Sequence, residues 1–192
     1  EADDSVLNMA GLNKEDDIFA PIIQSTKRRT LWLGANLVTA ILAAAAIGIF
    51  EATIEKIVTL AILMPIVASM GGIAGMQSLA LVIRSQATNQ IGSSNSKLLI
   101  LKESAIGVLN GILWSSVVSI AVYLWFDSVF LGVVIAVALL VNLIIGAISG
   151  VTLPLILKKL NIDPAIAGGV ILTTITDIVG FISLIGVATL IM

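Results

Sequence analysis

The sequence predicts an all-α integral membrane protein with five transmembrane helices. Hydrophobic residues make up 58% of its 192 residues and charged residues only 11%, whereas soluble domains carry about 25% charged residues. Five apolar runs reach the length of about 20 residues that a membrane-spanning helix needs, and basic residues gather in alternate loops between them. The expected helices cover residues 31–50, 57–83, 104–126, 129–157 and 165–192.

The Lys and Arg residues predict how these helices are oriented, because cytoplasmic loops carry an excess of them. Taken in chain order, the connections carry Lys27, Arg28 and Arg29, then Lys56, then Arg84, Lys97 and Lys102, then none, then Lys158 and Lys159. Basic-rich and basic-poor connections therefore alternate, as expected when each of the five runs crosses the membrane. We expect the N-terminus to be cytoplasmic and the C-terminus to lie outside.

Residues 1–29 precede the first expected span and read as a cytoplasmic, amphipathic connecting segment, separate from the five-helix domain of residues 30–192. The stretch "DDSVLNMAG" has the caps of a short helix. The stretch "DDIFAPIIQSTKRR" has the apolar pairs of a helix that lies at the membrane interface. A frayed chain end is the alternative for this segment.

A carboxylate, Asp177, stands near the midpoint of the last apolar run, in "TTITDIVG". An aspartate at the bilayer centre costs about 2.5–3.5 kcal/mol on insertion scales, and no Lys or Arg lies deep in another expected span. Helical spacing places Gly169, Thr173, Thr174 and Gly180 on the same face as Asp177. Because its side chains are small or carry hydroxyl groups, this face is predicted to line a water-filled path. The alternative is a protonated aspartic acid bonded to a carbonyl or a threonine.

The second expected helix contains "MPIVASMGGIAGMQS", in which Pro65 lacks a helical N–H and Gly71, Gly72 and Gly75 are weak helix formers. A helix that loosens here would present carbonyl oxygens, which membrane proteins tolerate where the backbone lines a water-filled cavity. Such oxygens attract cations. The alternative is close helix packing through the pair Gly71 and Gly75, which are four residues apart.

Several function classes are disfavoured by what the sequence lacks. It has no His and no Cys, so an ion site would use oxygen ligands, which suit hard cations such as Mg²⁺. Phosphate-loop, H-E-x-x-H and G-x-S-x-G motifs are missing, so we do not expect an enzyme or an ATP-driven pump. No basic surface for nucleic acid is evident.

Three stretches together resemble the MgtE family of magnesium channels. "MPIVASMGGIAGMQSLALVIRSQA" resembles the second transmembrane helix of that family, and "LKKLNIDPA" followed by "TTITDIVG" resembles its last loop and fifth helix. "LNMAGLNKEDDIFAPIIQSTKRR" resembles the entry into its first helix. The usual family pattern G-G-N-x-G-x-Q differs here, because Ile73 replaces the amide residue. Gly169 and Val170 stand where members often have a polar residue or proline.

The resemblance implies a homodimer whose pore lies at the two-fold axis, between the second and fifth helices of both copies, with Asp177 facing hydrated Mg²⁺. It also implies a multi-pass protein of the plasma (inner) membrane, here as the transmembrane domain without the family's sensor domains, and residues 1–29 would match its plug-like helix. The candidate ion-site residues are Asp177, Thr173, Gly169, Gly71, Gly72 and Gly75.

The expected function is passage of hydrated Mg²⁺ down its electrochemical gradient through the lipid bilayer. Two alternatives stay open from the residues. The first is a proton- or sodium-coupled divalent-cation transporter or exchanger on the same scaffold, with Asp177 as the coupling site. The second is an assembly subunit that does not transport and is held together by its small-residue helix faces.

Overall fold

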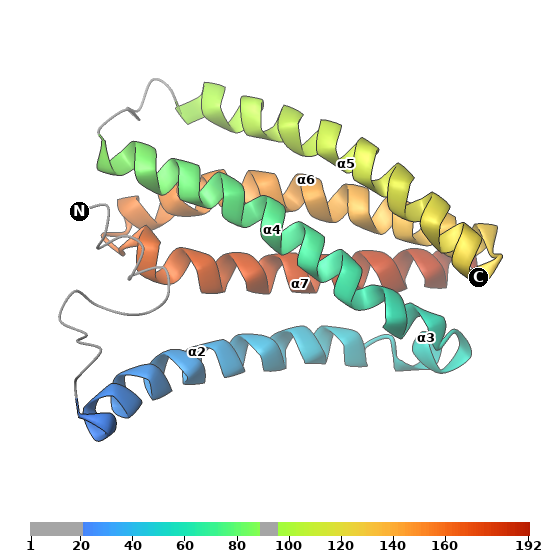
Figure 1. Cartoon of the computed structure of the whole chain (residues 1–192), viewed down its shortest axis with the longest axis horizontal. Coiled ribbons are helices and arrows are strands. Elements are labelled where there is room, and N and C mark those ends of the chain that lie inside the picture. Colours follow the sequence, from blue (N-terminus) through green and yellow to red (C-terminus); the bar gives the residue numbers. More distant parts are fainter. Residues whose placement is uncertain (1–20, 89–95) are drawn as a thin grey trace.

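The computed structural model describes residues 21–88 and 96–192, which form helices and short connections with no strand in these ranges (Figure 1). The helices are α2 (Ile22–Gly48), α3 (Glu51–Lys56), α4 (Thr59–Ala87), α5 (Ser96–Phe126), α6 (Val129–Lys159) and α7 (Pro164–Ile191). Five of them, all but α3, are long and apolar enough to cross a membrane. This confirms the predicted helical class and the predicted number of candidate spans. The short helix expected in residues 3–11 lies outside the described residues.

Two helices begin earlier than their apolar runs. Helix α2 begins at Ile22 rather than at residue 31, so residues 22–29 continue directly into the first span. Helix α5 begins at Ser96 rather than at residue 104. An apolar run marks the part of a helix that fits the hydrocarbon core, whereas the backbone can stay helical through polar residues at the interface.

The long helices alternate in direction. The α3 region, the α5–α6 turn and the C-terminus lie together at one end of the bundle (Figure 1). The start of α2, the end of α4, the start of α5 and the α6–α7 connection lie at the other end. The basic-rich connections therefore share one end and Lys56 lies at the opposite one, which is the arrangement that the charge pattern requires.

Helix α6 is the centre of the bundle, packing against α4, α5 and α7. Glycines permit these close contacts. A methyl group at Gly146 of α6 would lie 2.6 Å from the Gly71 carbonyl oxygen of α4. A methyl group at Gly107 of α5 would lie 2.8 Å from the Ala147 Cβ of α6. The small-residue faces of these three helices therefore act in helix packing.

Short polar residues set the starts of α6 and α7. Ser128 Oγ accepts a hydrogen bond from the Leu131 amide at 3.3 Å. Asp163 Oδ1 accepts one from the Ala165 amide at 2.8 Å, and Pro164 occupies the first turn of α7. Asp163 is therefore an N-cap, as the sequence predicts.

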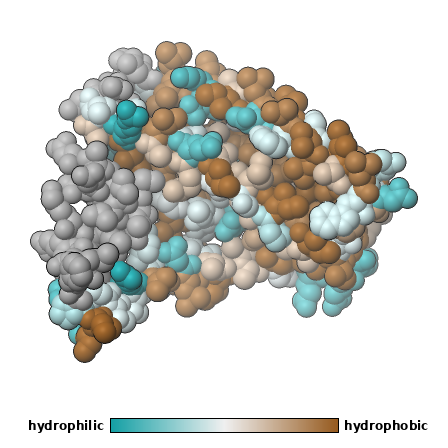
Figure 2. Space-filling view, viewed as in Figure 1, coloured by the Kyte–Doolittle hydropathy of each residue, from teal (hydrophilic) through white to brown (hydrophobic). Residues whose placement is uncertain are grey.

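Helix α2 stands apart from the rest of the bundle. Its main contacts are with α7, and its buried side chains, Ala43 and Ala46, lie in its C-terminal half. Toward its N-terminus the helix diverges from α7 (Figure 1). Its exposed Leu and Ile side chains, like the apolar residues on the face seen in Figure 2, suit a surface that contacts lipid tails.

Candidate functional site

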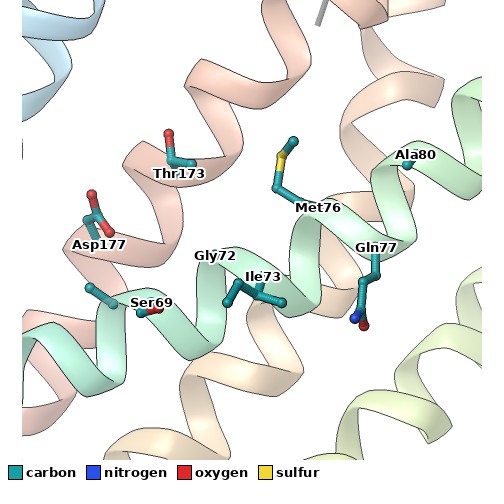
Figure 3. A pocket seen from close by; sticks show the side chains of 9 residues that line it. Ser69, Gly72, Ile73, Met76, Gln77, Ala80, Thr173 and Asp177 are labelled. Atoms are coloured by element: carbon teal, nitrogen blue, oxygen red, sulfur yellow. The ribbon is translucent and has the colours of Figure 1, made fainter. Parts of the chain in front are cut away.

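A surface-open pocket that contains a carboxylate lies between α4 and α7, with a volume of about 670 Å³ (Figure 3). Helix α7 contributes Thr173 and Asp177 to its lining. Helix α4 contributes Ser69, Gly72 and Gln77, together with four apolar residues. This cavity, called the Asp177 pocket below, combines one carboxylate with hydroxyl groups at the middle of two candidate spans.

Asp177 supplies the charge of this pocket. Its side chain is half-buried, and it forms no ion pair with a residue in the described ranges. Thr173 lies one helical turn earlier, so both side chains project from the same face of α7 (Figure 3). A carboxylate without a basic partner in an apolar setting needs water or a cation for compensation.

Thr173 presents its oxygen rather than its hydrogen to the pocket. Its hydroxyl hydrogen is directed to its own helix, where the Gly169 and Val170 carbonyl oxygens both lie 3.1 Å from Oγ1. The remaining lone pairs of Oγ1 can accept hydrogen bonds from water. Gly169 itself is not among the lining residues. A methyl group at Gly169 would meet Met76, 3.9 Å away.

The three glycines of α4 divide between two surfaces. Gly72 lines the Asp177 pocket, and a methyl group there would lie 3.8 Å from Thr176 Oγ1. Gly71 and Gly75 are buried on another face of the helix. A methyl group at Gly75 would lie 2.9 Å from Leu172 and 3.0 Å from the Gly146 carbonyl oxygen.

Helix α4 is continuous through these glycines, from Thr59 to Ala87 and past Pro65. The carbonyl groups of Gly71 and Gly75 therefore stay within a regular helix, directed along its axis. Gly71 and Gly75 therefore match the alternative of close helix packing. They do not match the expectation of a loosened helix that presents its carbonyl oxygens.

Asn142 of α6 holds the two pocket helices in place from behind. It is fully buried, and its Nδ2 donates a hydrogen bond to the Val67 carbonyl oxygen of α4 at 2.8 Å. A methyl group at Gly180 of α7 would lie 2.7 Å from the same Nδ2. Asn142 therefore fills the junction of α4, α6 and α7. It lies against Gly71 of α4 and against Gly180 of α7, which is about one helical turn after Asp177.

Ser69 is a pocket residue that sequence reasoning did not identify. Residues 69, 72, 73 and 76 follow the spacing i, i+3, i+4 and i+7, which marks one helix face. This spacing separates Gly72 from Gly71 and Gly75, but nothing in the sequence marks this face of α4 as the one that lines a pocket. Gln77 also borders the pocket, but its side chain points away from Thr173 and Asp177 (Figure 3).

The fold and this pocket define a class: multi-pass helical membrane domains with a carboxylate-bearing cavity between two spans. Residues 64–187 match the sequence profile of the MgtE family, described as "Divalent cation transporter". The chain is 34% identical over 189 residues to "Magnesium transporter MgtE" of Bacillus subtilis, which covers 98% of this chain and 42% of that protein. The chain belongs to the MgtE family.

Two further relatives carry the same name. The Enterococcus faecalis protein is 29% identical over 192 residues, covering 100% of this chain and 42% of that protein. The Thermus thermophilus protein is 29% identical over 164 residues, covering 85% of this chain and 36% of that protein. The chain thus spans about two fifths of the length of the curated relatives it matches.

Proposed function

We propose that this chain is a magnesium channel domain that passes hydrated Mg²⁺ across the plasma membrane, down its electrochemical gradient. The observation that carries the proposal is the Asp177 carboxylate, which lies in a pocket of about 670 Å³ near the midpoint of α7 and has no basic partner among residues 21–88 and 96–192. The family match supports divalent-cation transport, and the relatives' names support magnesium as the ion.

The pocket chemistry suits an ion that keeps its water. Mg²⁺ loses its water reluctantly and keeps several of its octahedral ligands as water. At about 30 Å³ for each water, a six-water shell occupies about 180 Å³, which is well within this cavity. Asp177 and Thr173 would accept hydrogen bonds from those waters. Ser69 would add a further hydroxyl, and Gly72 would leave room for the shell.

Within the described part of one chain, the pocket is lined by two helices, α4 and α7. A pore needs walls on all sides, so we propose a homodimer in which a second copy places the same two helices across a two-fold axis. Two Asp177 carboxylates would then face one cation. Gly71 and Gly75, which pack against neighbouring helices, would support this wall rather than contact the ion, and Gly169 would act through Met76.

The proposal is tested by Mg²⁺ flux into liposomes that contain the chain, with Asp177→Asn compared to the wild type. One charge a few ångströms from a divalent ion is worth several kcal/mol even at an effective dielectric of about 20. Screening by the ion's own waters reduces this. We expect the flux of Asp177→Asn at low Mg²⁺ to fall by at least about tenfold.

The matched control is Asp127→Asn, the same chemical change in the exposed α5–α6 turn. Asp127 has a φ of 49°, which Asn also adopts readily, so the turn should stay intact and the flux unchanged. Equal flux from Asp177→Asn and the wild type would contradict the pore assignment. Flux that requires an imposed proton or sodium gradient would favour the coupled transporter instead.

A further inference from the structure

A second pocket with polar residues lies between α4, α5 and α6, on the face of α4 that is turned toward α5. Its volume is about 120 Å³, and its polar lining consists of Gln77, Ser78, Glu103 and Asn110. None of these four residues was a candidate ion-site residue in the sequence analysis. Glu103 lies just before the third apolar run, so its carboxylate did not stand out as one inside a span. Gln77 borders both this cavity and the Asp177 pocket, but its side chain points away from Asp177 (Figure 3). This cavity is called the Glu103 pocket below, and its carboxylate is not part of the proposed Mg²⁺ path.

Glu103 is a buried carboxylate, with 6% of its surface exposed. Ser78 Oγ donates a hydrogen bond to Glu103 Oε2 at 2.7 Å across the α4–α5 contact. The nearby bases Lys97, Lys102 and Arg84 are exposed, and Glu103 forms no ion pair within residues 21–88 and 96–192. A buried charge without an opposite charge is strongly disfavoured, so either a proton or a cation in the cavity must balance this carboxylate.

The charge of the cavity favours a monovalent partner. Glu103 is the one carboxylate among the described residues that line it. One carboxylate balances one positive charge, whereas a divalent ion would leave an excess charge in an apolar setting.

We propose that the Glu103 pocket binds one small monovalent cation, with Na⁺ as its representative. Glu103 supplies the anionic oxygen. Ser78 supplies a hydroxyl oxygen, whose hydrogen is already used on Glu103. The amides of Gln77 and Asn110 at the rim supply neutral carbonyl oxygens, which are suitable ligands for a hard cation. The ion would also connect α4 to α5, which otherwise contact each other little compared with their contacts to α6.

The test is thermal unfolding of the whole purified chain in detergent with chelator, at one pH. NaCl replaces choline chloride at constant ionic strength, because the methyl groups of choline keep its charge farther from a carboxylate oxygen than Na⁺ can come. A ligand that binds only the folded state raises the unfolding midpoint with the logarithm of its concentration, once that concentration exceeds the dissociation constant. We expect Na⁺ at about ten times its dissociation constant to raise the midpoint by about 5 °C.

Glu103→Gln keeps the side-chain shape and an acceptor for Ser78, and it should abolish this Na⁺ response. Glu55→Gln, on the exposed face of α3, is the matched control and should retain it. Asp177→Asn should also retain the response, because the Asp177 pocket is separate. If Glu103→Gln does not fold, Asn110→Leu at an exposed rim position should raise several-fold the Na⁺ concentration that gives the same midpoint shift.

Three outcomes would overturn the proposal. The first is an equal unfolding midpoint of the wild type in Na⁺ and in choline. The second is a Glu103→Gln variant that responds to Na⁺ as the wild type does. The third is that lowering the pH in choline chloride reproduces the whole stabilisation and Na⁺ adds nothing, which means that a proton balances Glu103. None of these results bears on Mg²⁺ flux, so this inference and the proposed function stand or fall separately.

Discussion

Gly71 and Gly72 are neighbours in the chain, yet they lie on different surfaces of α4. Successive residues of a helix are rotated by about 100°. This rotation brings Gly71 against Asn142 and Gly72 toward the Asp177 pocket. The same glycine-rich stretch therefore serves close packing on one side and open space on the other.

Alanine substitutions should separate these two roles. Gly71→Ala would drive a methyl group into the buried Asn142 amide, and overpacking of this kind costs about 1–3 kcal/mol. Gly72→Ala meets no atom closer than 3.8 Å, so its stability should stay near that of the wild type. Thermal unfolding in detergent measures both. Equal unfolding midpoints for the two variants would contradict the packing described here.

Individual site residues were predictable to different degrees. The sequence could place Asp177 and Thr173 on one helix face, because a lone carboxylate deep in an apolar run is costly and its helical neighbours follow from the spacing. The structure places both in the lining of one pocket, and their contact with an ion stays a prediction. The face that α4 turns toward them could not be assigned, since nearly every residue of that helix is apolar or small. Only the neighbouring helices α6 and α7 determine it.

The start of α7 shows how an element positions the pocket. Asp163 caps the helix, and α7 then runs without interruption to Ile191, so the cap lies on the helix that carries Asp177. Loss of this cap frees amide groups at the interface end of the helix.

Asp163→Ala should lower the free energy of unfolding by about 1 kcal/mol, because the cap at the Ala165 amide is lost. Asp163→Asn retains a side-chain oxygen at the same place and should cost clearly less. Chemical unfolding followed by circular dichroism compares the two variants. An Asn variant as unstable as the Ala variant would indicate that the charge of Asp163, rather than its capping bond, carries the effect.

At the level of elements, the number and order of the spans followed from hydropathy. The short helix α3 did not, because its six residues, EATIEK, are too few and too polar to register as a span. Tertiary contact holds it in place: Thr53 is buried and its hydroxyl lies 2.8 Å from that of Thr189 near the end of α7. Such long-range contacts leave no periodic signal in the sequence.

At the scale of the whole molecule, the orientation in the membrane stays a prediction from the basic residues. The chain has no cysteine, so single-cysteine variants give a clean test in cells. Glu55→Cys, on α3, should react with a membrane-impermeant thiol reagent from outside. Ile162→Cys, in the α6–α7 connection, should react only after permeabilisation, and the reverse pattern would invert the orientation.

The loose seating of α2 gives the molecule a mechanical asymmetry. Ala43 and Ala46 hold the C-terminal half of α2 near the bundle, while its N-terminal half diverges from α7. The N-terminal half of α2 can therefore change its angle to the bundle while Ala43 and Ala46 stay in place. Such a movement would reach the rest of the molecule first through α7, the helix that carries Asp177, because the main contacts of α2 are with α7.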